Sequence, residues 1–179
     1  MRHSNPARQG RWLPYIGLCL TLTATAALGQ TCNHDSDSAA AAASRFSDPG
    51  DGTLGDASTG LTWKRCSEGQ TWDGATCTGS ASKHDWREAL DLAEGATDAG
   101  HDDWRVPSLD ELASLIDKAC AHPAIDLASF PDTPAGVFWS SNSDATNPDN
   151  AWYVHFNDGH AAKGHQLRGA HVRLVRGGD

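Results

Sequence analysis

The chain has 179 residues, a formal net charge of −9 at neutral pH and 39% hydrophobic residues. A chain of this length predicts one domain with short extensions, because a body of ~130 residues can bury roughly two-thirds of its unfolded surface. The acidic balance argues against nucleic acid as the main partner, because that binding depends on clustered Lys and Arg.

The N-terminal stretch is typical of a secretory signal peptide. The basic residues Arg2, Arg8 and Arg11 precede an apolar run over 13–28. The run ends in Ala27-Leu28-Gly29, which offers small residues at the cleavage position. We expect removal of residues 1–29, export to the periplasm, cell surface or medium, and no membrane span in the mature chain. A retained anchor is the weaker alternative, because the run falls short of the ~20 apolar residues of a bilayer span. Cleavage would remove three arginines and no acidic residue, which changes the formal charge from −9 to −12.

Four cysteines remain after this cleavage: Cys32, Cys66, Cys77 and Cys120. In an oxidising compartment they allow two disulfides in three connectivities. The short glycine-containing loop between them favours Cys66–Cys77, which leaves Cys32–Cys120 to tie the N-terminal tail to the second predicted helix. A metal site is the weaker alternative, because the sequence has no C-x-x-C pair.

The segment 30–45 is low in complexity and predicts a tether, whereas 46–179 has the composition of a folded domain. Turn-rich stretches on either side of Leu61-Thr62-Trp63-Lys64-Arg65 predict a short hairpin. Three aspartates in these turns suggest calcium as an alternative, but their spacing is not that of a calcium-binding loop: Asp48, Asp51 and Asp56.

Two capping patterns predict two helices. Asp85 with Glu88 begins the first, and Gly95 ends it. Ser108 with Glu111 begins the second at about Leu109, and helical apolar spacing extends it until before Pro123. Each apolar stripe predicts one buried helix face: Trp86, Ala89, Leu90 and Ala93 in the first, and Leu109, Leu112, Ala113, Leu115, Ile116 and Ala119 in the second.

The C-terminal third predicts antiparallel sheet. We expect strands at 137–141, at 151–156 with Trp152, Val154 and Phe156 on one face, and at 171–176. Two polar stretches between them, 142–150 and 159–170, are expected to be loops, where recognition is usually carried. Five tryptophans are expected in the core, namely Trp63, Trp86, Trp104, Trp139 and Trp152. Trp72 is the candidate for an exposed or partner-facing role.

A series of motifs over residues 46–178 resembles the C-terminal domain family of the Legionella collagen-like adhesin (Lcl). The motifs, in order, are Gly52-Thr53, Thr59-Gly60-Leu61-Thr62-Trp63, Glu88-Ala89-Leu90, Asp103-Trp104-Arg105-Val106-Pro107-Ser108 with Glu111-Leu112, Phe138-Trp139-Ser140-Ser141, Ala151-Trp152 with Phe156, Asp158-Gly159 and Val172-Arg173-Leu174-Val175-Arg176-Gly177. More distantly, the W-R-V-P-S-x-x-E-L segment and the closing strand resemble formylglycine-generating-enzyme-like proteins.

The resemblance implies an extracytoplasmic domain with an α+β, C-type-lectin-like fold, in which two helices pack on short antiparallel sheets and disulfides add support. It also implies kinship with an adhesin that binds sulfated glycosaminoglycans. Two departures matter: the chain has no Gly-X-Y stalk, and its acidity leaves one small basic cluster near the C-terminus, Lys163, Arg168, Arg173 and Arg176. The enzymatic branch of the wider fold uses cysteines near its C-terminal end, and this chain has none after Cys120.

We therefore expect a binding module and no enzyme, since the sequence has no G-x-S-x-G or H-E-x-x-H motif. No cofactor is expected. The predicted ligand-binding residues are Tyr153, His155, Lys163, His165 and Arg168. A zinc or copper site formed by His155, His160, His165 and His171 with Asp158 is a weaker alternative, because the spacing matches no compact metal motif.

The first functional hypothesis is adhesin-like or lectin-like recognition of a glycan or another surface ligand. The alternative is a structural or accessory subunit of a surface appendage, whose partner would be a protein. An exposed apolar patch would favour the second hypothesis. The sequence does not settle the oligomeric state.

Overall fold

A computed structural model describes residue 1 and residues 29–34 and 45–178. The described chain has two helices, four antiparallel sheets and two disulfides, Cys32–Cys120 and Cys66–Cys77. The predicted α+β class and both disulfides are confirmed, whereas a C-type-lectin-like topology stays a prediction. The predicted signal peptide and most of the predicted tether lie outside the described residues. Within those residues no helix has the length and apolar character needed to cross a bilayer.

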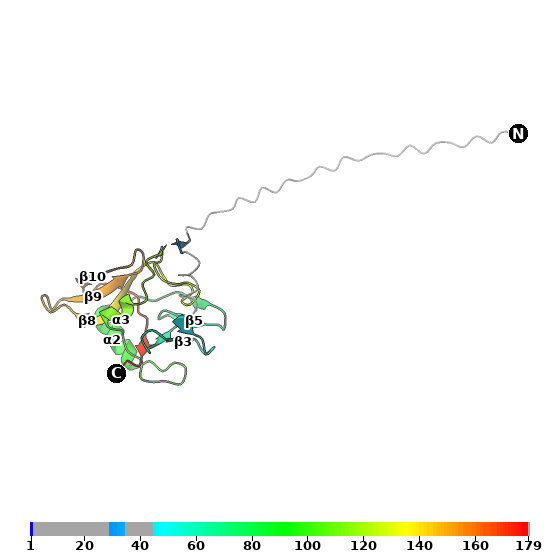
Figure 1. Cartoon of the computed structure of the whole chain (residues 1–179). Coiled ribbons are helices and arrows are strands. Elements are labelled where there is room, and N and C mark those ends of the chain that lie inside the picture. The colour runs from blue at the N-terminus through cyan, green and yellow to red at the C-terminus, as the bar shows by residue number, and fades with distance from the viewer. Residues whose placement is uncertain (2–28, 35–44, 179) are drawn as a thin grey trace.

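Short strands dominate the molecule. The helices are α2 (Trp86–Glu94) and α3 (Leu109–Ala113). The sheets, in strand order, are β1 (Thr31–Cys32) with β7 (Cys120–Ala121); β10 (His160–His165), β9 (Asn150–His155) and β8 (Val137–Ser143); β11 (Val175–Arg176), β4 (Thr62–Lys64), β3 (Thr53–Asp56) and β2 (Phe46–Ser47); and β5 (Gln70–Trp72) with β6 (Cys77–Gly79). In Figure 1 the β8–β10 sheet lies on one side of the molecule and β3 and β5 lie on the other.

Both helices begin where the capping patterns predict. The Asp85 side chain accepts the Glu88 amide hydrogen, and the Ser108 side chain accepts that of Glu111. In return, each glutamate carboxylate accepts the backbone amide hydrogen of its cap residue. These reciprocal bonds satisfy amides that a first helical turn leaves without partners.

The predicted end of the second helix is wrong, because α3 stops at Ala113. The chain continues in tight turns, and Cys120 then enters β7, paired with Cys32 in β1. Leu115 is buried and Ile116 is partly buried in these turns, so both pack on the core without being helical. The disulfide and the β1–β7 ladder therefore override the local helical pattern.

The expected loop at 159–170 is also wrong over its first half, which forms β10. All six residues of β10 pair with β9, from His160 opposite His155 to His165 opposite Asn150. The strand has little intrinsic preference for extended structure, since its sequence is HAAKGH. The predicted turn at Asn157-Asp158-Gly159 brings it back against β9, where the backbone ladder holds it.

Both faces of the β8–β9 layer are covered. Phe138 and Val154 point into one core cluster with Leu112 of α3, whereas Trp139 and Tyr153 point into the other with the buried face of α2. The expectation of a single buried face for β9 was therefore incomplete. Among the tryptophans, Trp63, Trp104 and Trp139 are buried as expected, whereas Trp86 and Trp152 are only half-buried, as is Trp72.

The predicted closing strand at 171–176 is mostly irregular, with regular pairing only in β11. Residues 171–175 are nevertheless buried, because the segment runs between the two core clusters. Val172 and Leu174 contribute to the cluster under α2, and Val175 contributes to the other.

Candidate functional site

The end of β10 meets the start of α2 in a seam of backbone hydrogen bonds. The His84 and Ala170 backbones exchange two bonds of 2.9 Å, and the Trp86 amide donates to the Gln166 carbonyl at 2.8 Å. The turn after β10, residues 166–169, is therefore held on a rigid scaffold although it is exposed. Loops supported in this way are common positions for recognition.

Arg168 and Tyr153 form the centre of this seam. The Arg168 guanidinium lies 5.1 Å from the centre of the Tyr153 ring and donates to the Tyr153 hydroxyl at 3.5 Å. Tyr153 is only 8% exposed, and it packs edge-on to Trp139 at 6.1 Å. Gly164 leaves room for the ring, since a Cβ there would lie 3.0 Å from it. Tyr153 thus supports an exposed cation and is not itself an open surface.

Lys163 points to the opposite face of the sheet. Its ammonium donates to Asp144 at 2.8 Å and lies 4.7 Å from the centre of the Trp152 ring. The bond from Lys163, followed by the Thr146 amide, lowers the pKa of Asp144 to about 2. The charge of Lys163 is therefore compensated by a fixed, ionised carboxylate.

The predicted histidine series does not converge on one point. His155 and His160 stack at 5.4 Å, and both lie near Asp158, at 3.7 and 2.6 Å. His165 is at the other end of β10, and buried His171 lies in a different segment, bonded through Nδ1 to the Ser82 carbonyl. The four imidazoles cannot share a metal ion in this arrangement.

The five predicted ligand-binding residues are thus separated. Tyr153 and Arg168 are in contact, and His155 lies two residues along the same face of β9. Lys163 and His165 belong by strand alternation to the other face. His165 accepts the Leu167 amide hydrogen at 3.2 Å and so stabilises the turn.

The small basic cluster expected near the C-terminus is also wrong. Arg173 is fully buried, Arg176 pairs with Asp103 at 2.7 Å, and Lys163 pairs with Asp144. Among the described residues, only Arg168 of that set is exposed without a carboxylate within ion-pair distance. The four residues lie in different settings, because Lys163 is in β10, Arg168 is in the turn after it, and Arg173 and Arg176 are in and just after the buried segment 171–175.

Two further cations that sequence reasoning missed border the seam. Lys83 starts beside Gly169, where an added Cβ would lie 3.5 Å from the Lys83 Cβ, and Arg87 follows Trp86 in the first turn of α2. In the described part of the chain, neither these two nor Arg168 has a carboxylate within ion-pair distance. No local signal could have found Lys83, because 85 residues separate it from Arg168 along the chain.

The aspartates considered for calcium each have a separate partner. Asp48 pairs with Arg65 at 2.5 Å, and Asp51 accepts bonds from the amide and hydroxyl of Thr53. Asp56 pairs with Arg45 at 2.5 Å. The three carboxylates therefore stabilise turns and do not form a shared cation site.

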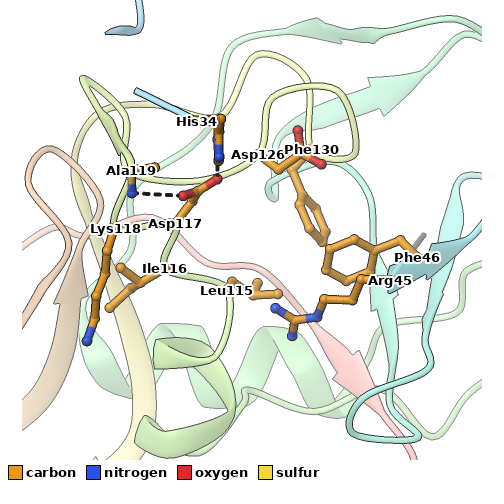
Figure 2. A pocket seen from close by; sticks show the side chains of 10 residues that line it. All are labelled: His34, Arg45, Phe46, Leu115, Ile116, Asp117, Lys118, Ala119, Asp126 and Phe130. Carbon is orange, nitrogen blue, oxygen red and sulfur yellow. Dashed lines mark hydrogen bonds and ion pairs between the residues drawn. The ribbon is translucent and has the colours of Figure 1, made fainter. Parts of the chain in front are cut away.

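A pocket of about 380 Å³ lies on another part of the molecule (Figure 2). One of its lining residues is His34, whose Nε2 is 3.3 Å from the Cys120 sulfur. Phe46 and Phe130 form one wall, and Leu115 lies at the base. The Arg45 guanidinium is bonded to Asp56 and to the Ser114 carbonyl, so it is not free for a ligand. The chain that joins rim residues His34 and Arg45 lies outside the described residues. We therefore assign no ligand to this pocket.

We call the surface formed by Arg168, Tyr153, Lys83 and Arg87 the Arg168 seam. It can hold an anionic or hydrogen-bonding group, because its three cations have no carboxylate partner in the described structure and their backbone is fixed by the bonds between 166–170 and 84–86. Beside these cations, Ser82 Oγ lies 2.7 Å from His84 Nε2, and His84 Nδ1 lies 4.0 Å from a Glu88 carboxylate oxygen. The family model described as the Lcl C-terminal domain matches residues 52–176. No curated protein matches the chain.

Proposed function

Because the chain belongs to the Lcl C-terminal domain family, which is associated with a collagen-like adhesin, we propose that it is an exported, non-enzymatic binding module that recognises a glycan at the Arg168 seam. The observation that carries the proposal is an exposed, uncompensated guanidinium fixed over a buried tyrosine. Arg168, Tyr153 and Lys83 are the central residues of the proposed site.

The electrostatics support a local site and not a broad basic surface. The mature chain is strongly acidic, and most of its cations are committed to carboxylates. A charged group at the seam would therefore be recognised by a few fixed contacts. Arg suits such recognition, because its planar fork donates two parallel bonds to a carboxylate or sulfate.

The alternative role, docking on a protein of a surface appendage, has less support. Among the described residues, Leu167 and the N-terminal Met1 are the exposed large hydrophobic side chains, and one exposed leucine does not make an apolar patch. Two disulfides support export, because such bonds persist in oxidising compartments.

The test is a glycan array of neutral, carboxylated and sulfated sugars, probed with the purified, disulfide-bonded protein. It is run with calcium, with zinc and with a chelator. We expect selective binding of acidic sugars that Arg168→Ala reduces at least tenfold. The matched control is Lys118→Ala, which removes the same charge from an exposed side chain at the pocket of Figure 2.

Equal losses in the two variants would contradict a site at the seam and indicate a long-range charge effect. A blank array in all three conditions would contradict glycan recognition and favour a protein partner. Binding that survives Arg168→Ala would place the site elsewhere.

A further inference from the structure

The N-terminal disulfide lies beside a histidine and a carboxylate. His34 Nε2 is 3.3 Å from the Cys120 sulfur and 3.0 Å from Asp117 Oδ2 (Figure 2 shows the second contact). The polar contacts of the ring in the described structure are made through Nε2, and Nδ1 is buried without a hydrogen-bond partner among the described residues. One ligand atom each from Cys32, His34 and Cys120 lies within 4.8 Å of the other two, and the described residues contain no second group of this kind.

These distances resemble the edges of a zinc coordination tetrahedron. With Zn–S of about 2.3 Å and Zn–N or Zn–O of about 2.0 Å, neighbouring ligand atoms are separated by roughly 3.3–3.8 Å. The Nε2–Sγ distance fits this range, and the Nε2–Oδ2 distance is a few tenths of an ångström shorter. The two sulfurs are the exception, because they are covalently bonded. Breaking that bond allows them to separate to an ordinary contact distance.

We propose that Cys32, Cys120, His34 and Asp117 bind a zinc ion when the Cys32–Cys120 disulfide is reduced. A dithiol reductant supplies two electrons and two protons, which break the S–S bond and give two thiols while the reductant becomes a disulfide. Zinc then displaces the two thiol protons and binds both thiolates, with His34 Nε2 and an Asp117 oxygen as the remaining ligands. The disulfide and the zinc ion are thus alternative links between β1 and β7.

The backbone keeps the ligands together without the S–S bond. Thr31 pairs with Ala121 and Cys32 with Cys120, and the Asn33 amide donates to the Ala119 carbonyl at 2.8 Å. Asp117 is oriented separately, since its Oδ1 accepts the Ala119 amide hydrogen at 3.0 Å. The four groups therefore come from two segments that are already joined, which lowers the entropy cost of assembling the site.

The second disulfide provides an internal comparison. Cys66–Cys77 closes a loop of the β5–β6 hairpin, and no histidine or carboxylate joins its sulfurs within ligand distance in the described structure. Reduction there yields two thiols without the other ligands. The chemistry required for a zinc site is found at one disulfide of the two.

The test is titration with Co²⁺, a spectroscopic substitute for zinc, of the whole protein under anaerobic conditions with a phosphine reductant. We expect one thiolate-to-cobalt charge-transfer absorption per chain, which zinc displaces and which the oxidised protein lacks. His34→Ala and Asp117→Asn should each weaken cobalt binding at least tenfold. His160→Ala removes an exposed histidine elsewhere and should leave the affinity unchanged.

The reduced His34→Ala variant keeps all four thiols. Cobalt that binds thiols nonspecifically, or binds a chain unfolded by reduction, would therefore bind this variant and the wild type equally. A difference of less than tenfold, or no thiolate absorption in the reduced wild type, overturns the proposal. The glycan array uses the oxidised protein, so failure of either proposal leaves the other intact.

Discussion

Arg173 is fully buried, and in the described structure no carboxylate lies within ion-pair distance of it. Its guanidinium donates to the carbonyls of Lys64 and Arg65 and to the Thr133 hydroxyl at 2.7 Å, and it lies 4.7 Å from the centre of the Phe130 ring. Burial lowers the pKa of Arg173 to about 9, so the side chain is still charged at neutral pH. Backbone and hydroxyl oxygens provide the compensation for this charge.

Arg173→Lys should therefore be strongly destabilising despite keeping the charge. An ammonium cannot reach acceptors on both sides of a planar fork, and buried oxygens would lose their donors. We expect the free energy of unfolding to fall by about 2–4 kcal/mol, measured by urea denaturation. Arg176→Lys, at the half-exposed pair with Asp103, should cost less than about 0.5 kcal/mol. Equal effects would contradict a structural role specific to Arg173.

At the scale of elements, the β9–β10 hairpin depends on its turn. Gly159 has a φ of 72°, in the region that side chains rarely adopt. A Cβ at this position would lie 2.7 Å from the Ile116 side chain, in the turns that follow α3. The hairpin turn is therefore packed closely against the segment that leads to Cys120. Gly60, between β3 and β4, has the same φ of 72° but no atom within 4 Å of an added Cβ.

These two glycines allow backbone strain to be separated from packing. Gly60→Ala should cost about 1 kcal/mol, the strain of a left-handed conformation with a side chain. Gly159→Ala should cost at least about 1 kcal/mol more, because Ile116 must also move. Thermal and urea unfolding of the two variants would measure the difference. If both lose the same stability, the hairpin is not packed on Ile116 as described.

At the scale of the whole molecule, ionised carboxylates hold distant segments together. Burial would raise the pKa of Asp56, but hydrogen bonds from Arg45 and Ser58 outweigh it and hold this pKa well below its usual range. Arg45 also donates to the Ser114 carbonyl, so Asp56 indirectly links β3 to the end of α3. Asp144 similarly links the loop after β8 to Lys163 of β10. These links require the charged form of each aspartate.

We therefore predict acid-induced loss of stability. The pKa of Asp144 is lower in the folded state, about 2, than the value of about 3.9 in an unfolded chain, so the unfolded state binds protons first as the pH falls. The stabilisation is complete above about pH 5, and it is lost as the pH falls through 4 towards 2. Urea midpoints measured across this range should fall less steeply in Asp144→Asn, which starts from a lower stability at pH 7. Asp91→Asn, at an exposed position of α2, should keep the slope of the wild type.

The sequence by itself determined the features that depend on neighbouring residues. The starts of both helices were predictable because Asp85 with Glu88, and Ser108 with Glu111, bond to their own backbone. The hairpin turns and the short-loop disulfide Cys66–Cys77 were predictable for the same reason. The family was also recognisable from ordered motifs, and the matched range of 52–176 lies within the predicted domain.

Only the tertiary structure decided which distant groups meet. The β9 ladder makes a strand of β10 although its residues have little strand preference, and β1 ends the helical pattern by pairing with Cys120. Lys163 in β10 and Arg168 in the turn after it contact different partners, and a long-range bridge brings Lys83 beside Gly169, the neighbour of Arg168. The contact of His34 with Asp117 arises in the same way, across 83 positions of the chain. Such contacts depend on packing between segments, for which a single sequence carries no local signal.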